Sequence, residues 1–100
     1  EEGGLEVLNK DGSWIKVEPS SNAIVCNIGD MMQLVTDKNL TSTTHRVIQD
    51  LDAEPKPRYS IPFFLHPAPS ILLKSVFNEN DKGVLAEDFL NERLKAIKLY

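Results

Sequence analysis

The sequence predicts a mainly β domain that ends in a single α-helix. For about three-quarters of its length, runs rich in β-branched and aromatic residues are separated by turn sequences, as in a β protein. From Ala86 onward, apolar residues recur instead at three- and four-residue spacing, which is typical of an amphipathic helix. We therefore expect one domain over residues 1–100, with strands between about 4 and 76 and a helix from about 86 to 98.

The first strand pair is expected near the N-terminal end. The runs "LEVLN" (5–9) and "SWIKVEP" (13–19) alternate in polarity around the turn sequence "KDG" (10–12). An Asp-Gly pair between alternating runs is a strong short-range signal for a β-hairpin. The next apolar run, "AIVCNIG" (23–29), predicts a short strand ended by a glycine, and Cys26 within it is interpreted as a small buried apolar side chain.

The middle of the chain predicts two longer strands and a shorter one. Pro62 lies inside the second of them, which favours an edge or a bulge because proline cannot donate to a strand ladder. The expected elements are one helical turn and a further turn at 30–39, a strand at 40–48, a polar loop at 49–57, a strand at 58–65 and a short strand at 71–76.

The C-terminal helix is expected to pack through one apolar stripe. Acidic residues lie early in this segment and basic residues late, as the helix dipole prefers. No good N-cap residue precedes Ala86. The stripe consists of Phe89, Leu90, Leu94 and Ile97.

Composition excludes several classes of protein. The 41% hydrophobic and 26% charged residues are typical of a globular chain. A net charge of −4, with no cluster of Lys and Arg, argues against nucleic-acid binding. No apolar run approaches the ~20 residues that a membrane-spanning helix needs, and no signal peptide is recognisable. The single Cys26 excludes an internal disulfide, so a cytoplasmic location is the expectation.

Three residues are candidates for binding chemistry. His45 lies in an alternating strand-like run, where a structural histidine is the common alternative to a metal ligand. Arg58 and Ser60 are two residues apart, so on a strand their side chains would project to the same face. A guanidinium fork beside a hydroxyl is a suitable receptor for a carboxylate, although many surface Arg-x-Ser pairs have no such role.

Together these residues resemble one family. "NIGDMMQLVTDKNLTSTTHRV" followed by "RYSIPFFLHP" resembles the C-terminal half of the catalytic domain of 2-oxoglutarate- and iron(II)-dependent oxygenases, of the isopenicillin N synthase-like group. "GLEVLNKDGSWIKVEP" is similar to the hairpin that precedes it, and "DFLNERLKAIKLY" to the C-terminal helix. The resemblance extends over essentially the whole chain.

The resemblance implies a fold and a site. The fold is the C-terminal part of a double-stranded β-helix, a jelly roll in which we expect about six to eight strands in two facing layers. His45 corresponds to the distal histidine ligand of the iron, and Arg58 and Ser60 to the residues that bind the distal carboxylate of 2-oxoglutarate. Arg46 and Asp30 also fall on motif positions and are interpreted as structural, as an ion pair near the rim of the sheet.

The chain departs from the family in one respect. The other two iron ligands belong to a His-x-Asp or His-x-Glu motif, which does not occur in these 100 residues. We therefore expect a fragment of an enzyme that oxidises a small organic substrate, inactive by itself and binding neither iron(II) nor 2-oxoglutarate stoichiometrically. The alternative is a non-catalytic β-rich module that has lost the metal site. Either would expose strand edges, so we expect a homodimer or larger oligomer. The oxidised substrate is not evident from the sequence.

Overall fold

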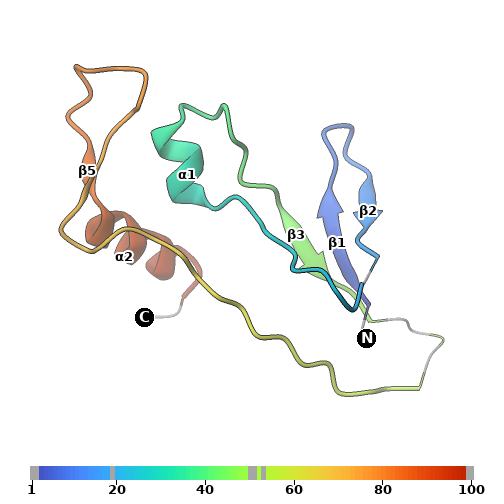
Figure 1. The fold of residues 1–100 in the computed structure, drawn as a ribbon. Helices are drawn as coiled ribbons and strands as arrows, with labels where there is room; N and C mark the ends of the chain where they lie inside the picture. The colour runs from blue at the N-terminus through green and yellow to red at the C-terminus, as the bar shows by residue number, and fades with distance from the viewer. Residues whose placement is uncertain (1–2, 19, 50–51, 53, 99–100) are drawn as a thin grey trace. The chain divides into compact units, whose positions relative to one another are not determined.

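The computed structural model describes residues 3–18, 20–49, 52 and 54–98. The chain divides into two compact units, Glu1–Asn27 with Thr43–Phe63, and Ile28–Ser42 with Phe64–Tyr100. The described elements are, in order, β1 (Leu5–Leu8), β2 (Trp14–Lys16), α1 (Asp30–Val35), β3 (His45–Val47), β4 (Leu72–Leu73), β5 (Val84–Leu85) and α2 (Ala86–Ala96); Figure 1 labels all of them except β4.

The first unit is a three-stranded antiparallel sheet with β1 at its centre. The strand order is β2-β1-β3, so β1 pairs with both of its neighbours (Figure 1). The predicted hairpin is confirmed. Its turn is closed by Asp11, whose Oδ1 accepts hydrogen bonds from the backbone N–H of Ser13 at 2.8 Å and from its hydroxyl at 2.5 Å. Gly12 has φ +87°, a conformation that a glycine adopts without strain.

Two predicted strands, 23–29 and 58–65, are wrong. Neither segment pairs with a described strand, and their apolar side chains are exposed. Ile24 is 90% exposed and Cys26 is exposed rather than buried. A β-strand is stabilised by cross-strand pairs and by packing on one face, and alternation alone supplies neither. These segments therefore have the sequence of strands but lack a partner among the described residues.

The second unit has a small core between a two-stranded sheet and two helices. Strands β4 and β5 pair antiparallel, and the buried residues are Leu73 of β4 with Ala86 and Phe89 of α2. Met31 and Val35 of α1 pack against this cluster. The expected helical turn at 30–39 is thus a six-residue helix, and the backbone N–H of Val76 donates to the Val35 carbonyl oxygen at 2.8 Å to hold its end.

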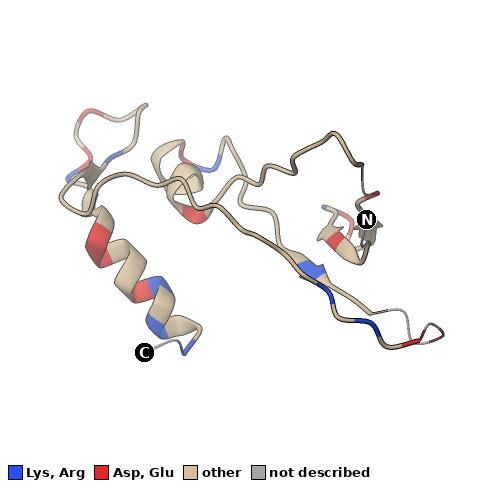
Figure 2. Cartoon of the chain, turned by 60° about the horizontal axis from the view of Figure 1, so that its bottom comes forward, with Lys and Arg blue, Asp and Glu red and all other residues tan. Residues whose placement is uncertain are grey.

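Helix α2 begins where the periodicity predicts and ends two residues earlier than expected. Leu85 precedes it without a side-chain cap, which confirms the weak N-terminal signal. Acidic residues lie in its first turn and basic residues in its last turn, a separation that Figure 2 shows along the helix. The apolar stripe is buried at Phe89 and half-buried at Leu90 and Leu94, whereas Ile97 is 64% exposed.

The described elements confirm the predicted class, mainly β with a C-terminal helix. They comprise five strands where about six to eight were expected, because two of the expected segments do not pair. Within the described part of the chain, no helix combines the length and the apolar character required to cross a bilayer.

We predict a pH-dependent contribution from Asp81, whose carboxylate closes the loop between β4 and β5. It accepts hydrogen bonds from the backbone N–H groups of Ser75 at 2.8 Å and Gly83 at 3.0 Å, and these hold its pKa below the ordinary 3.8. A lowered pKa in the folded state stabilises at pH values above 3.8, and the contribution is lost as the pH falls through the folded-state pKa. Asp81→Asn keeps an acceptor but not the charge.

The urea midpoints of wild type and Asp81→Asn should therefore differ at pH 7 and converge as the pH falls below 3.8 and through the folded-state pKa. An equal difference across this pH range would show that the charge of Asp81 is not responsible.

Candidate functional site

His45 begins strand β3 and is exposed. Its Nδ1 lies 3.2 Å from the carbonyl oxygen of Thr43. A neutral imidazole with its proton on Nδ1 donates to that oxygen, and its Nε2 then carries the free lone pair. A hydrogen bond on one ring nitrogen is the usual way in which a protein orients a histidine that binds a metal through the other. The local geometry therefore fits one imidazole ligand.

The three-stranded sheet has two chemically different faces. Strand pairing sets His45 opposite Val7 and Val7 opposite Ile15, so these side chains share one face. Leu5 and Val47 lie on the same side. This apolar face, defined as Leu5, Val7, Ile15, His45 and Val47, places the imidazole among aliphatic side chains. Ile15 and Val47 are 47% and 52% exposed, so the face is largely uncovered in this chain.

The opposite face carries an arginine that bridges three strands. Arg46 Nε donates to Glu6 Oε2 at 2.8 Å, and its guanidinium carbon lies 3.9 Å from the centroid of the Trp14 ring. Glu6 is on β1 and Trp14 on β2, so this cluster, the Arg46 clamp, ties β3 to both partners. The proposed pairing of Arg46 with Asp30 is wrong, because Asp30 pairs instead with Arg93 at 3.5 Å.

The clamp was not predicted as a unit, although the register of the strands contains the signal. Glu6 faces Arg46 directly across β1 and β3, and Lys16 faces Glu6 across the hairpin. Opposite charges directly across an antiparallel pair attract each other. The hairpin was predicted, but the pairing of β1 with β3 joins residues forty positions apart, which no local pattern reveals.

Arg58 and Ser60 lie in an extended segment, and the prediction that they are on a strand is wrong. Both are exposed and belong to the same compact unit as His45. Arg58 Nε donates to the carbonyl oxygen of Gly3 at 3.1 Å. The structure thus brings the three predicted site residues into one unit and attaches the arginine to the segment just before β1.

The segment that carries Arg58 also carries large apolar side chains that are exposed. Ile61, Phe63 and Leu65 are 97%, 87% and 90% exposed. Such a stretch of large apolar side chains is unusual on the surface of a complete domain, and it indicates a surface that another segment or chain covers.

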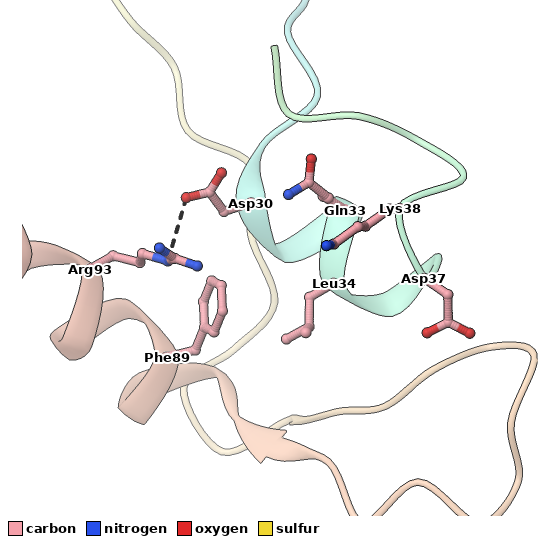
Figure 3. A pocket seen from close by; sticks show the side chains of 7 residues that line it. All are labelled: Asp30, Gln33, Leu34, Asp37, Lys38, Phe89 and Arg93. Carbon is pink, nitrogen blue, oxygen red and sulfur yellow. Dashed lines mark ion pairs between the residues drawn. The ribbon is translucent and has the colours of Figure 1, made fainter. Parts of the chain in front are cut away.

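The second unit contains a shallow pocket of about 400 Å³, shown in Figure 3. Phe89 and Leu34 contribute its apolar wall, and the ion pair of Asp30 with Arg93 crosses its rim (Figure 3). The remaining lining residues are Gln33, Asp37 and Lys38. Asp37 also accepts a hydrogen bond from the Ser75 hydroxyl at 2.6 Å, so its carboxylate already has a structural role.

The described residues do not contain a complete metal site. No group of three or more His, Cys, Asp or Glu side chains comes together among them. Three ligands in a facial arrangement are what holds iron(II) in non-haem oxygenases, and His45 fits one of these positions. The sequence contains no His-x-Asp or His-x-Glu motif, which would supply the other two positions.

Comparison with known proteins identifies the family. The family model of the 2OG-Fe(II) oxygenase superfamily matches residues 1–67, which is two-thirds of the chain. The chain belongs to the 2OG-Fe(II) oxygenase superfamily. The matched range includes β1, β2, β3, His45 and the segment with Arg58 and Ser60.

Individual members of the 2OG-Fe(II) oxygenase superfamily are similar over most of the chain. A 2-oxoglutarate-Fe(II) type oxidoreductase, ppzC, of Metarhizium rileyi is 36% identical over 92% of this chain and 26% of its own length. A 1-aminocyclopropane-1-carboxylate oxidase of Prunus mume is 36% identical over 77% of this chain and 25% of its own. The chain therefore spans about a quarter of the length of these relatives.

A solved structure extends the similarity to the backbone. The crystal structure of a 2OG-Fe(II) oxygenase family protein from Caulobacter crescentus matches 98% of this chain and 35% of its own, with a TM-score of 0.86 and 40% identity. An oxygenase structure from Shewanella oneidensis matches 99% with a TM-score of 0.77 and 39% identity. The predicted fold class, the C-terminal part of a double-stranded β-helix with one C-terminal helix, is confirmed.

We predict that Arg46 contributes more to the stability of the first unit than Arg93 contributes to the stability of the second unit. Arg46→Met removes the 2.8 Å ion pair and the 3.9 Å ring contact and should lower the free energy of unfolding by about 1–2 kcal/mol. Arg93→Met is the matched control, since Arg93 also lies beside a carboxylate and an aromatic ring, but at 3.5 Å and 5.0 Å.

Urea unfolding of both variants measures the difference. Equal losses for Arg46→Met and Arg93→Met would contradict a special role for the clamp.

Proposed function

We propose that residues 1–100 form part of the catalytic domain of a 2-oxoglutarate- and iron(II)-dependent dioxygenase. The whole enzyme would oxidise a small organic substrate with decarboxylation of 2-oxoglutarate. The observation that carries the proposal is the occurrence of His45, Arg58 and Ser60 in one compact unit of a chain that belongs to this superfamily. The chain spans about a quarter of its curated relatives, and the rest of the domain would supply the other ligands.

His45 would hold the iron through Nε2. The Thr43 carbonyl orients the ring by accepting from Nδ1, and the neighbours of the imidazole on the apolar face are aliphatic. When bound, iron(II) supplies the activation of oxygen that the protein's own side chains cannot perform. The role of this chain is to present one ligand in a fixed orientation.

Arg58 and Ser60 would bind the distal carboxylate of 2-oxoglutarate. The guanidinium presents several N–H donors in one plane, and a hydroxyl two residues away adds one more. Because the co-substrate is a dicarboxylate, holding one end by Arg58 leaves the other end free to reach the metal. The chain thus orients the co-substrate rather than reacting with it.

A non-catalytic module is the second candidate. The observations in its favour are the incomplete ligand set and the exposed apolar side chains at Ile24, Ile61 and Phe63. A chain that uses these side chains to form a homodimer or larger oligomer would cover them without any need for iron. The two candidates differ in whether residues outside this chain complete the iron site.

We predict that the chain binds 2-oxoglutarate weakly through Arg58. One charge-assisted contact contributes about 1.5–3 kcal/mol, which is too little to replace chelation of the other end by iron. A dissociation constant of about 1 mM, or about 4 kcal/mol, is the expected strength. Titration followed by NMR chemical shifts should show binding to wild type and to Arg93→Leu, and none to Arg58→Leu. Equal binding by Arg58→Leu would remove Arg58 from the site.

Iron content separates the two candidates. The chain by itself should hold well under one iron per molecule, because one imidazole is a poor site for iron(II). Expressed with the coding sequence that precedes it in the gene, it should hold about one iron, and His45→Gln should abolish this. Iron-free protein from the longer sequence would favour the non-catalytic module, and full iron occupancy in His45→Gln would exclude His45 as a ligand.

A further inference from the structure

The two glycines before β1 make two contacts. Gly4 contacts Ile48, just after β3, and Gly3 contacts Arg58. Gly4 has a positive φ of +103°, and a Cβ atom added to it would lie 2.5 Å from the carbonyl oxygen of Ile48. Its own carbonyl accepts from the Ile48 N–H at 2.8 Å. The backbone at this point therefore approaches Ile48 closely on two sides, and only glycine fits.

This close approach determines where the Gly3 carbonyl points. Gly3 precedes Gly4 directly, and its oxygen accepts the Nε–H of Arg58 at 3.1 Å. The arginine comes from a segment that is not assigned to a strand, and this contact to the segment before β1 restrains its side chain. The restraint acts on one particular nitrogen of the guanidinium.

The choice of nitrogen has a chemical consequence. A guanidinium can offer a carboxylate two kinds of paired donors: Nε with one terminal nitrogen, or the two terminal nitrogens together. With Nε engaged by Gly3, the edge that includes Nε is occupied. A carboxylate that binds Arg58 while this contact persists therefore pairs with the two terminal nitrogens, Nη1 and Nη2.

We propose that Gly3 and Gly4 are positioning residues for the dicarboxylate co-substrate: the Gly3 carbonyl holds Arg58 by Nε, so that the carboxylate binds end-on to Nη1 and Nη2. The inference rests on the proposed function, since it takes 2-oxoglutarate as the ligand of Arg58. It adds a recognition geometry and two residues that the sequence did not suggest. Gly4 sets the position of the Gly3 carbonyl, and neither glycine contacts the ligand.

The NMR signal of the Arg58 Nε–H tests the geometry directly. The chain contains three arginines, and Arg58→Leu identifies which of the three signals belongs to Arg58. In ligand-free protein the Arg58 Nε–H should exchange with water more slowly than that of an unbonded arginine. During titration with 2-oxoglutarate, at constant ionic strength, this signal should keep its protection and move little. A large downfield shift of this signal at saturation would show that the carboxylate takes Nε, and it would overturn the proposal.

A pair of glycine variants tests the positioning role. Gly4→Ala should abolish the protection of the Arg58 Nε–H and weaken 2-oxoglutarate binding about fivefold, since one orienting contact is lost. Gly12→Ala is the matched control, because Gly12 also has a positive φ of +87° but an added Cβ there meets nothing within 4 Å. It should lower stability while leaving the affinity within twofold of wild type.

The outcomes distinguish a failure of the positioning role from a failure of the proposed function. Unchanged affinity and protection in Gly4→Ala would overturn the positioning role even if Arg58→Leu abolishes binding. Absence of 2-oxoglutarate binding by wild type would overturn both the function and the inference, while the ligand-free exchange rates would still report the Gly3 contact. If Gly4→Ala does not fold, the titration of the Nε–H in wild type decides the question alone.

Discussion

The pairing of β1 with β3 is the interaction on which the candidate site depends. It joins residues about forty positions apart and sets Val7 opposite His45 and Glu6 opposite Arg46. A slip of one residue would exchange the two faces, because side chains alternate along a strand. The Arg46 clamp opposes such a slip, since its ion pair and ring contact exist in one register only. Of these two neighbouring residues, Arg46 stabilises the strand register and His45 lies on the apolar face.

The same strand pair adjoins the arginine that we propose as the ligand of the co-substrate. Where β1 begins, Gly4 and Ile48 are in close contact, and the Gly3 carbonyl receives Arg58. An imidazole near one end of the β1–β3 ladder and a guanidinium at the other are the two groups that a chelating dicarboxylate would need at its two ends. Backbone hydrogen bonds of the ladder position His45, and a side-chain hydrogen bond to Gly3 positions Arg58.

The second unit is stabilised differently. Its few buried residues, Leu73, Ala86 and Phe89, lie at one junction of strand and helix, and hydrogen bonds to Asp81 and Ser75 close the loop beside it. The first unit has no comparable core among its described residues, because its apolar face is open. In a family whose strands form two facing sheets, an open face on one sheet is the surface that the opposing strands would cover.

Local sequence by itself determined the hairpin, the start of α2 and the identity of the candidate residues. The Asp-Gly turn, the helical spacing around Phe89 and the motif residues His45, Arg58 and Ser60 are all encoded within short windows. Tertiary structure alone decided that 58–65 pairs with no strand of the described residues, that Glu6 rather than Asp30 pairs with Arg46, and that Gly3 accepts from Arg58. The physical reason is that each of these depends on contacts between segments distant in the chain. The alternation of apolar and polar residues indicates which side of a strand is apolar, but it does not indicate which other segment lies beside that strand.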